Sequence, residues 1–158
     1  LGLQAAASAT LDDAVTDAPI VTLITNATKP FLTSAMVARG SHLNAMGAIV
    51  PARCEFTQDI FSRCDMIAVD SIASARELSS EFRERFGDDE RTWNKVRPIS
   101  NLIAHDLTRP ADSDLTLFKA MGMGISDLAL GIEVLARAEK RGGATTLPER
   151  IRVPPRLQ

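Results

Sequence analysis

The sequence has 158 residues, of which 45% are hydrophobic and 24% are charged, and its formal net charge is -2. This composition is typical of one globular domain, and the near balance of charges gives no electrostatic support for nucleic-acid binding. The apolar runs are too short to cross a membrane. The two cysteines, Cys54 and Cys64, do not form a CxxC motif and are too few for a disulfide framework, so we expect a cytoplasmic protein.

Four short apolar segments are predicted to be buried strands. They are Ile20 to Thr25, His42 to Gly47, Met66 to Asp70 and Leu115 to Lys119. Each is apolar on both faces, which is typical of a sheet covered by helices on both sides. The first three begin about 22 residues apart, which leaves room for the crossover that parallel strands need. The pattern therefore predicts an α/β domain with a parallel sheet.

Helix signals occur between these segments. Thr10, three residues before Asp13, forms an approximate capping box for a short first helix. The charged stretch from Ser79 to Phe86 predicts another helix, with Glu81 and Arg85 paired on an exposed face.

The clearest predicted helix lies within residues 121–143. Its apolar residues recur every three or four positions, and they are Ile125, Leu128, Ala129, Ile132, Leu135 and Ala136. Glu133 and Arg137 are expected to pair on the other side, and Gly142 and Gly143 end the helix. Residues 144–158 contain three prolines and no periodicity, which predicts an extended tail.

Ligands of an open parallel sheet bind beyond the carboxyl ends of its strands. There, Thr25, Asn26 and Thr28 offer small polar groups suited to a ribose, and Gly47 permits close approach of the backbone to a flat or anionic group. The segment LTLFKAMGMGIS imitates a nucleotide-binding turn. However, Asp127 occupies the position of the third small residue, so we do not interpret the segment as a dinucleotide fingerprint.

Other catalytic signals are weak. His42 falls in a predicted core strand, where a hydrogen-bonded structural role is the expected one. The sequence contains no HExxH motif, no histidine pair at metal-ligand spacing and no GxSxG motif, so neither a metal site nor serine-hydrolase chemistry is predicted.

Four segments, taken in order, resemble the ornithine cyclodeaminase/mu-crystallin family. They are APIVTLITNATKPFL at residues 18–32, GSHLNAMGA at 40–48, MIAVDS at 66–71 and DLTLFKAMGMGISDLALGIEVL at 114–135. The resemblance implies an NAD(P)-dependent enzyme, usually a homodimer, with a Rossmann domain inserted in a substrate and dimerisation domain.

The family's pattern starts upstream of Leu1, so we expect the chain to be the C-terminal half of a member. Residues 1–120 would then be the C-terminal part of a Rossmann-like NAD(P)-binding domain with flanking helices. Residues 121–143 would be a long helix that returns to the substrate and dimerisation domain, and residues 144–158 a tail.

The resemblance also implies a set of cofactor-binding residues. They are Thr25, Asn26, Ala27, Met46, Gly47, Ala48, Ile49, Arg53, Ala120 and Met121. Ile49 stands where ornithine cyclodeaminases have an acid–base aspartate, and isoleucine cannot transfer a proton, so no catalytic residue is assigned. Arg53 stands where a lysine is usual, and Ala120 replaces a serine.

Three functions remain open. The first is an NAD(P)-dependent enzyme acting on small amino or imino acids, either converting ornithine to proline with release of ammonia or reducing an imino acid or ketimine. Ile49 favours the reductase. The second is a non-catalytic cofactor or ligand binder like mu-crystallin, and the third is an inactive fragment. The choice between NAD and NADP stays open, because the residue that reads the ribose 2′ position would precede Leu1.

Overall fold

The computed structural model describes residues 2–143, 145, 147 and 148. Most of the predicted tail at 144–158 therefore lies outside the described residues. The chain divides into two compact units, Leu1–Gly122 and Met123–Gln158, and each is described by itself. Within the described residues, no helix combines the length and the hydrophobicity needed to cross a membrane.

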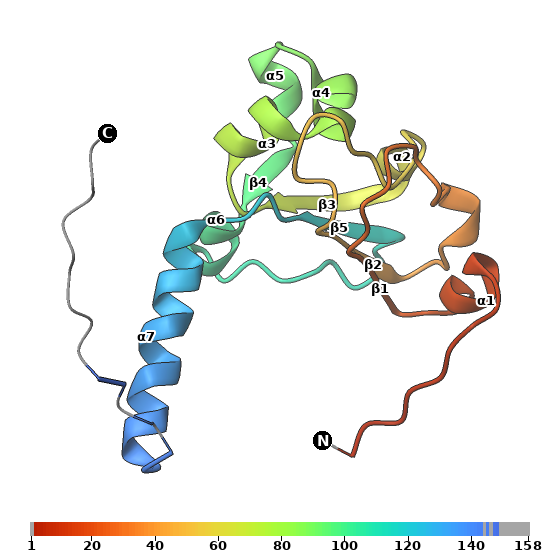
Figure 1. The fold of residues 1–158 in the computed structure, drawn as a ribbon. Helices are drawn as coiled ribbons and strands as arrows, with labels where there is room; N and C mark the ends of the chain where they lie inside the picture. Colours follow the sequence, from red (N-terminus) through yellow and green to blue (C-terminus); the bar gives the residue numbers. More distant parts are fainter. Residues whose placement is uncertain (1, 144, 146, 149–158) are drawn as a thin grey trace, which may run out of the picture. The chain divides into compact units, whose positions relative to one another are not determined.

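A five-stranded parallel sheet forms the centre of the first unit (Figure 1). Its strands, in spatial order, are β1 (Ile20–Leu23), β2 (Ser41–Ala45), β5 (Leu115–Lys119), β3 (Cys64–Val69) and β4 (Val96–Pro98). Four of them overlap the predicted segments and all their pairings are parallel, which confirms the predicted α/β sheet. Strand β4 was not predicted, because three residues that include Arg97 and Pro98 form no apolar run.

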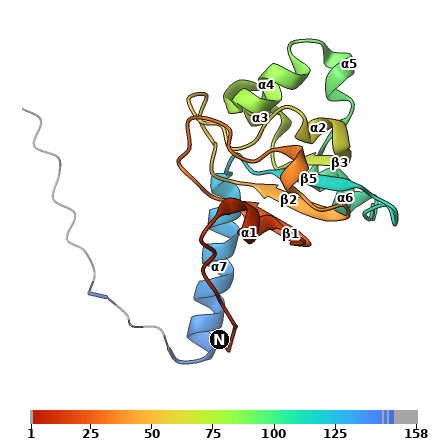
Figure 2. The ribbon, with the colours of Figure 1, turned by 90° about the vertical axis from the view of Figure 1, so that its right-hand side faces the viewer.

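Short helices connect the strands. They are α1 (Leu11–Val15), the 3-10 turn η1 (Ser34–Met36), α2 (Ile60–Arg63), α3 (Ile72–Leu78), α4 (Ser80–Phe86), α5 (Glu90–Trp93) and α6 (Ile99–Ala104). Thr10 caps α1 by accepting a hydrogen bond from the Asp13 amide at 3.1 Å, which confirms the predicted cap. Figures 1 and 2 show α3, α4 and α5 over one face of the sheet and α6 on the opposite side.

The hydrophobic core lies between the sheet and the helices α4 and α5, which cover one face of it. Alternate residues of the central strands, such as Leu43 and Leu117, are buried here. The rings of Phe61, Phe82 and Trp93 join the same cluster, and Phe61 and Phe82 meet edge to face with centroids 5.1 Å apart.

The opposite face of the sheet is only partly covered. Ile20 on β1 is 63% exposed, so the expected cover on both faces is incomplete at this edge. On β2, His42 is half-buried, and its ring nitrogens lie 2.7 Å from Thr116 Oγ1 and 3.1 Å from Asn44 Oδ1. These contacts agree with the predicted structural role of the histidine.

The second unit contains α7 (Gly124–Lys140), which confirms the predicted long helix. Glu133 and Arg137 form the predicted ion pair at 2.6 Å. The apolar stripe is exposed in the described structure, with Ile125 at 72% and Leu135 at 56%. Gly142 follows the helix with φ +62°, the left-handed conformation expected at a helix end.

Candidate cofactor-binding edge

The carboxyl ends of three neighbouring strands meet at one edge of the sheet. Leu23 pairs with Ala45, and Ala45 pairs with Lys119. The segments that follow them, residues 24–27, 46–49 and 120–122, are therefore neighbours. Nine of the ten residues predicted to bind cofactor lie in these three segments. The tenth, Arg53, lies further along the loop after β2.

The exposed side chains at this edge are of two kinds. Thr25 and Asn26 are exposed polar residues at the end of β1, whereas Met46 and Ile49 are exposed apolar residues at the end of β2, at 39% and 38%. Two other predicted residues, Ala48 and Met121, are buried, so their side chains belong to the packing beneath the edge. The edge thus offers a polar rim next to an apolar surface.

A buried carboxylate that the sequence analysis did not select connects the first two segments. Glu55 is fully buried, and its Oε1 accepts hydrogen bonds from the Thr25 amide at 2.7 Å and from the Thr25 hydroxyl at 2.8 Å. Its Oε2 accepts from the amides of Gly47 at 3.0 Å and Ala48 at 3.1 Å. The Thr25 hydroxyl, expected to line a ribose, therefore donates its proton inside the protein.

Gly47 lies where the two segments touch. A Cβ atom at this position would stand 2.3 Å from the Thr25 nitrogen and 2.4 Å from Glu55 Oε1. The glycine was expected to let a ligand approach the backbone. In the structure, the space it leaves is filled by the protein's own Thr25 backbone and by the Glu55 carboxylate.

A second buried carboxylate corrects the prediction made for α4. Glu81 was expected on an exposed face beside Arg85, but it is fully buried, and its Oε2 lies 3.5 Å from Nζ of the equally buried Lys119. Its Oε1 accepts a hydrogen bond from the Glu55 amide at 3.0 Å. Strand alternation could have found this pair, because Lys119 shares a face with Leu115 and Leu117. A lysine on a buried face needs an acidic partner.

The third segment is held by Asp70, which follows β3. Its Oδ2 accepts hydrogen bonds from the amides of Met121 and Gly122, both at 2.8 Å. Gly122 has φ +87° and open space where a Cβ would be. A glycine at this position is therefore required by the backbone conformation and not by close packing.

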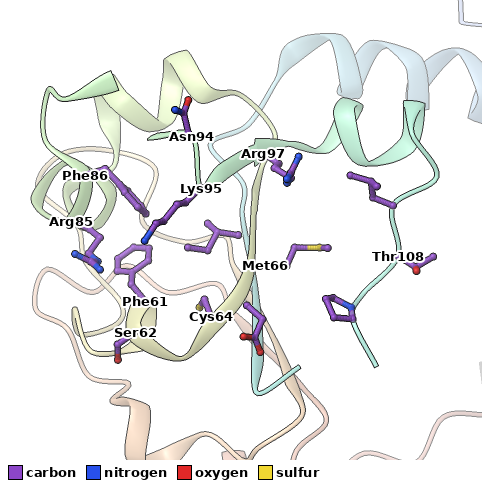
Figure 3. Close-up of a pocket in the computed structure, with 14 residues that line it drawn as sticks. Phe61, Ser62, Cys64, Met66, Arg85, Phe86, Asn94, Lys95, Arg97 and Thr108 are labelled. Atoms are coloured by element: carbon purple, nitrogen blue, oxygen red, sulfur yellow. The ribbon is translucent and has the colours of Figure 1, made fainter. Parts of the chain in front are cut away.

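A cavity of about 640 Å³ lies at the opposite, amino edge of β3 and β4. Figure 3 shows Phe61, Phe86 and the basic Arg85 on one side of it and Met66 on the other. None of the residues predicted to bind cofactor lines this cavity. Among the described residues, no group of three or more His, Cys, Asp or Glu side chains is arranged to hold a metal ion.

Comparison with known proteins gives the family. The sequence matches the ornithine cyclodeaminase/mu-crystallin family over residues 1–142. The chain belongs to this family. Its relatives include a delta(1)-pyrroline-2-carboxylate reductase of Bacillus cereus, which is 24% identical over 133 residues, or 83% of this chain and 41% of that protein. They also include the ketimine reductase mu-crystallin of Macropus fuliginosus, 31% identical over 121 residues, or 74% of this chain and 35% of that protein.

Solved structures share the fold. The delta(1)-pyrroline-2-carboxylate reductase of Thermococcus litoralis, solved with NADH and L-proline, superposes with a TM-score of 0.74 at 19% identity. The match covers 87% of this chain and 43% of that protein. This family member thus spans about two fifths of the length of the relatives it matches.

Proposed function

We propose that the complete gene product carrying this chain is an NAD(P)-dependent oxidoreductase that reduces the C=N bond of a small imino acid. The observation that carries the proposal is the carboxyl edge of β1, β2 and β5, where a polar rim adjoins an exposed apolar surface. The family relationship and the fold shared with a reductase solved with NADH and L-proline support it.

The residues of this edge fit a nicotinamide nucleotide. The exposed Asn26 amide can hydrogen-bond to a ribose, while Met46 and Ile49 can pack against the flat face of a nicotinamide ring. The bound cofactor would supply the hydride, and the protein contributes binding and orientation. At this edge, the chain's own part is to hold the ring end of the cofactor and to keep water from its apolar side.

Ile49 favours reduction over ornithine cyclisation. Cyclisation releases ammonia and requires protons to move at the substrate nitrogen, for which an acid–base side chain is suited. Isoleucine has no titratable group, and its side chain is 38% exposed at the edge. A reductase demands less of such a group at this position.

We also propose the organisation of the protein that contains the chain. Residues 1–120 would form the C-terminal part of the NAD(P)-binding domain, and residues 121–143 would lead to a substrate and dimerisation domain. The exposed apolar stripe of α7, with Ile125 and Leu135, suits a helix that packs against such a domain in a homodimer.

The test is turnover by the complete gene product. NADH and NADPH are each supplied with delta(1)-pyrroline-2-carboxylate, and absorbance at 340 nm is followed. We expect consumption of one or both cofactors with formation of proline, and no proline from ornithine with NAD alone. Proline formation from ornithine would overturn the assignment as a reductase. Binding of the cofactor without turnover on any cyclic imine would identify a non-catalytic binder.

A further inference from the structure

Glu55 holds two strand ends together at the candidate cofactor-binding edge. The four hydrogen bonds to its carboxylate divide evenly, because Oε1 accepts both donors of Thr25, after β1, and Oε2 accepts the amides of Gly47 and Ala48, after β2. Glu55 itself lies 30 residues beyond Thr25 and eight beyond Gly47. One side chain therefore joins the two segments beyond the ends of their strands, beside the backbone hydrogen bonds from Met46 to Leu23 at 2.8 Å and from Cys54 to Ala27 at 3.1 Å.

Hydrogen bonds compensate for the burial of the Glu55 carboxylate. A fully buried carboxylate is costly unless its oxygens are satisfied, and each oxygen here has two donors. The nearby ion pair of Glu81 and Lys119 holds the backbone of Glu55, because Glu81 Oε1 accepts a hydrogen bond from the Glu55 amide at 3.0 Å. The position of Glu55 is thereby fixed by α4 and β5.

The contact at Gly47 leaves no room for the segments after β1 and β2 to move closer together. Because a single carbon atom there would stand 2.3 Å from the Thr25 nitrogen, the segments after β1 and β2 are at their closest approach. A change in the length or charge of residue 55 must therefore move one segment relative to the other. Met46 and Ile49 would move with the second segment.

We infer that Glu55 is a positioning residue for the nicotinamide end of the cofactor. Its carboxylate sets the separation between the polar rim at Asn26, which would bind the ribose, and the apolar surface of Met46 and Ile49, and so orients a nicotinamide ring packed on that surface for hydride transfer. The inference rests on the proposed function. Glu55 touches neither ring nor substrate and acts through the two segments that it holds.

The first test measures the two segments without cofactor. In Glu55→Gln, the side chain keeps its size but replaces one oxygen with an NH2 group, which must face amide or hydroxyl donors. Hydrogen exchange by mass spectrometry on the complete gene product should show at least tenfold faster exchange in peptides covering residues 25–27 or 46–49. Unchanged exchange in both peptides would overturn the inference, whatever the enzyme proves to do.

The second test measures turnover per NADH-binding site, counted by fluorescence titration, so that unfolded molecules do not contribute. We expect Glu55→Gln to lower turnover per site at least tenfold. The control is Asp114→Asn, which breaks the ion pair with Arg63 at the opposite edge of the sheet and should leave turnover per site unchanged. Equal losses in both variants would indicate a general structural effect and overturn the inference.

A milder variant covers the case in which Glu55→Gln does not fold. Thr25→Val keeps the shape of the side chain and removes its hydroxyl, which donates to Glu55 at 2.8 Å and accepts from the Ala27 amide at 3.3 Å. It should lower turnover per site about threefold, and wild-type turnover would overturn the inference. Full turnover per site in Glu55→Gln would overturn the inference but not the proposed function. A wild-type protein that binds neither NADH nor NADPH would overturn both.

Discussion

At the scale of single residues, Gly47 shows that the close packing of two segments at the carboxyl edge of the sheet depends on the absence of one Cβ atom. A glycine after a strand predicts close approach to the backbone, but the sequence does not say which group approaches. The structure places the Thr25 backbone and the Glu55 carboxylate in that space. Glu55 itself carried no signal, because a lone acidic residue in a loop is usually solvated.

We predict that Gly47→Ala destabilises the protein. The added methyl group would stand 2.3 Å from the Thr25 nitrogen, and a backbone atom cannot move away as a flexible side chain can. Such overpacking lowers the free energy of unfolding by about 1–3 kcal/mol. Urea denaturation measures the loss. Gly131→Ala in α7, where a Cβ meets nothing within 4 Å, is the matched control and should not destabilise.

Cys64 gives a residue-scale prediction about pH. Burial raises the pKa of its thiol from 9.0 to about 12. The thiolate is the reactive form, so at pH 8 a thiol reagent should modify Cys64 about a thousandfold more slowly than a free cysteine. The measurement uses Cys54→Ser, in which Cys64 is the remaining cysteine of the sequence. Labelling of the native variant at the rate of free cysteine would contradict the assignment.

The raised pKa of Cys64 also determines whether stability rises or falls with pH. Between pH 9 and about 12, the folded protein keeps the Cys64 proton while the unfolded chain loses it. The unfolded state then binds fewer protons, so stability falls as pH rises through this window. Cys64→Ala should make the free energy of unfolding depend less on pH between 8 and 10.

At the scale of elements, α4 was predicted with nearly correct bounds, but Glu81 was placed on its exposed face and is in fact buried. The spacing of Glu81 and Arg85 indicated an exposed pair, because charged residues four apart usually lie on the solvent side. The pairing of Glu81 with Lys119 joins α4 to β5 across the core, 38 residues apart in the sequence. Helical periodicity describes one element at a time, so it does not reveal a partner on a strand.

We predict that Lys119→Met lowers the free energy of unfolding by about 3–5 kcal/mol, because it leaves the Glu81 carboxylate buried without its cation. Arg85→Met on the same helix is the control, since Arg85 is exposed and its loss should cost less than about 0.5 kcal/mol. Urea denaturation of the two variants compares them directly. Equal stabilities of the two variants would contradict the prediction that the Glu81 carboxylate depends on Lys119.

At the scale of the whole molecule, the parallel sheet could be predicted from the sequence because four of its strands are short apolar runs at crossover spacing. The order of the strands could not, since β5 lies between β2 and β3 although it comes last in the chain. The incomplete cover over β1 was also not predicted. Apolar residues on both faces of a strand indicate burial, and Ile20 is nevertheless 63% exposed in this chain.

The most direct test of the account is the location of the cofactor. In the complete gene product with labelled methyl groups, titration with NADH or NADPH should shift the NMR signals of Met46 and Ile49 at the carboxyl edge of the sheet. Met66, which lines the cavity at the opposite edge, should not shift. Shifts confined to Met66 would contradict the account and place the nucleotide at the other end of the strands.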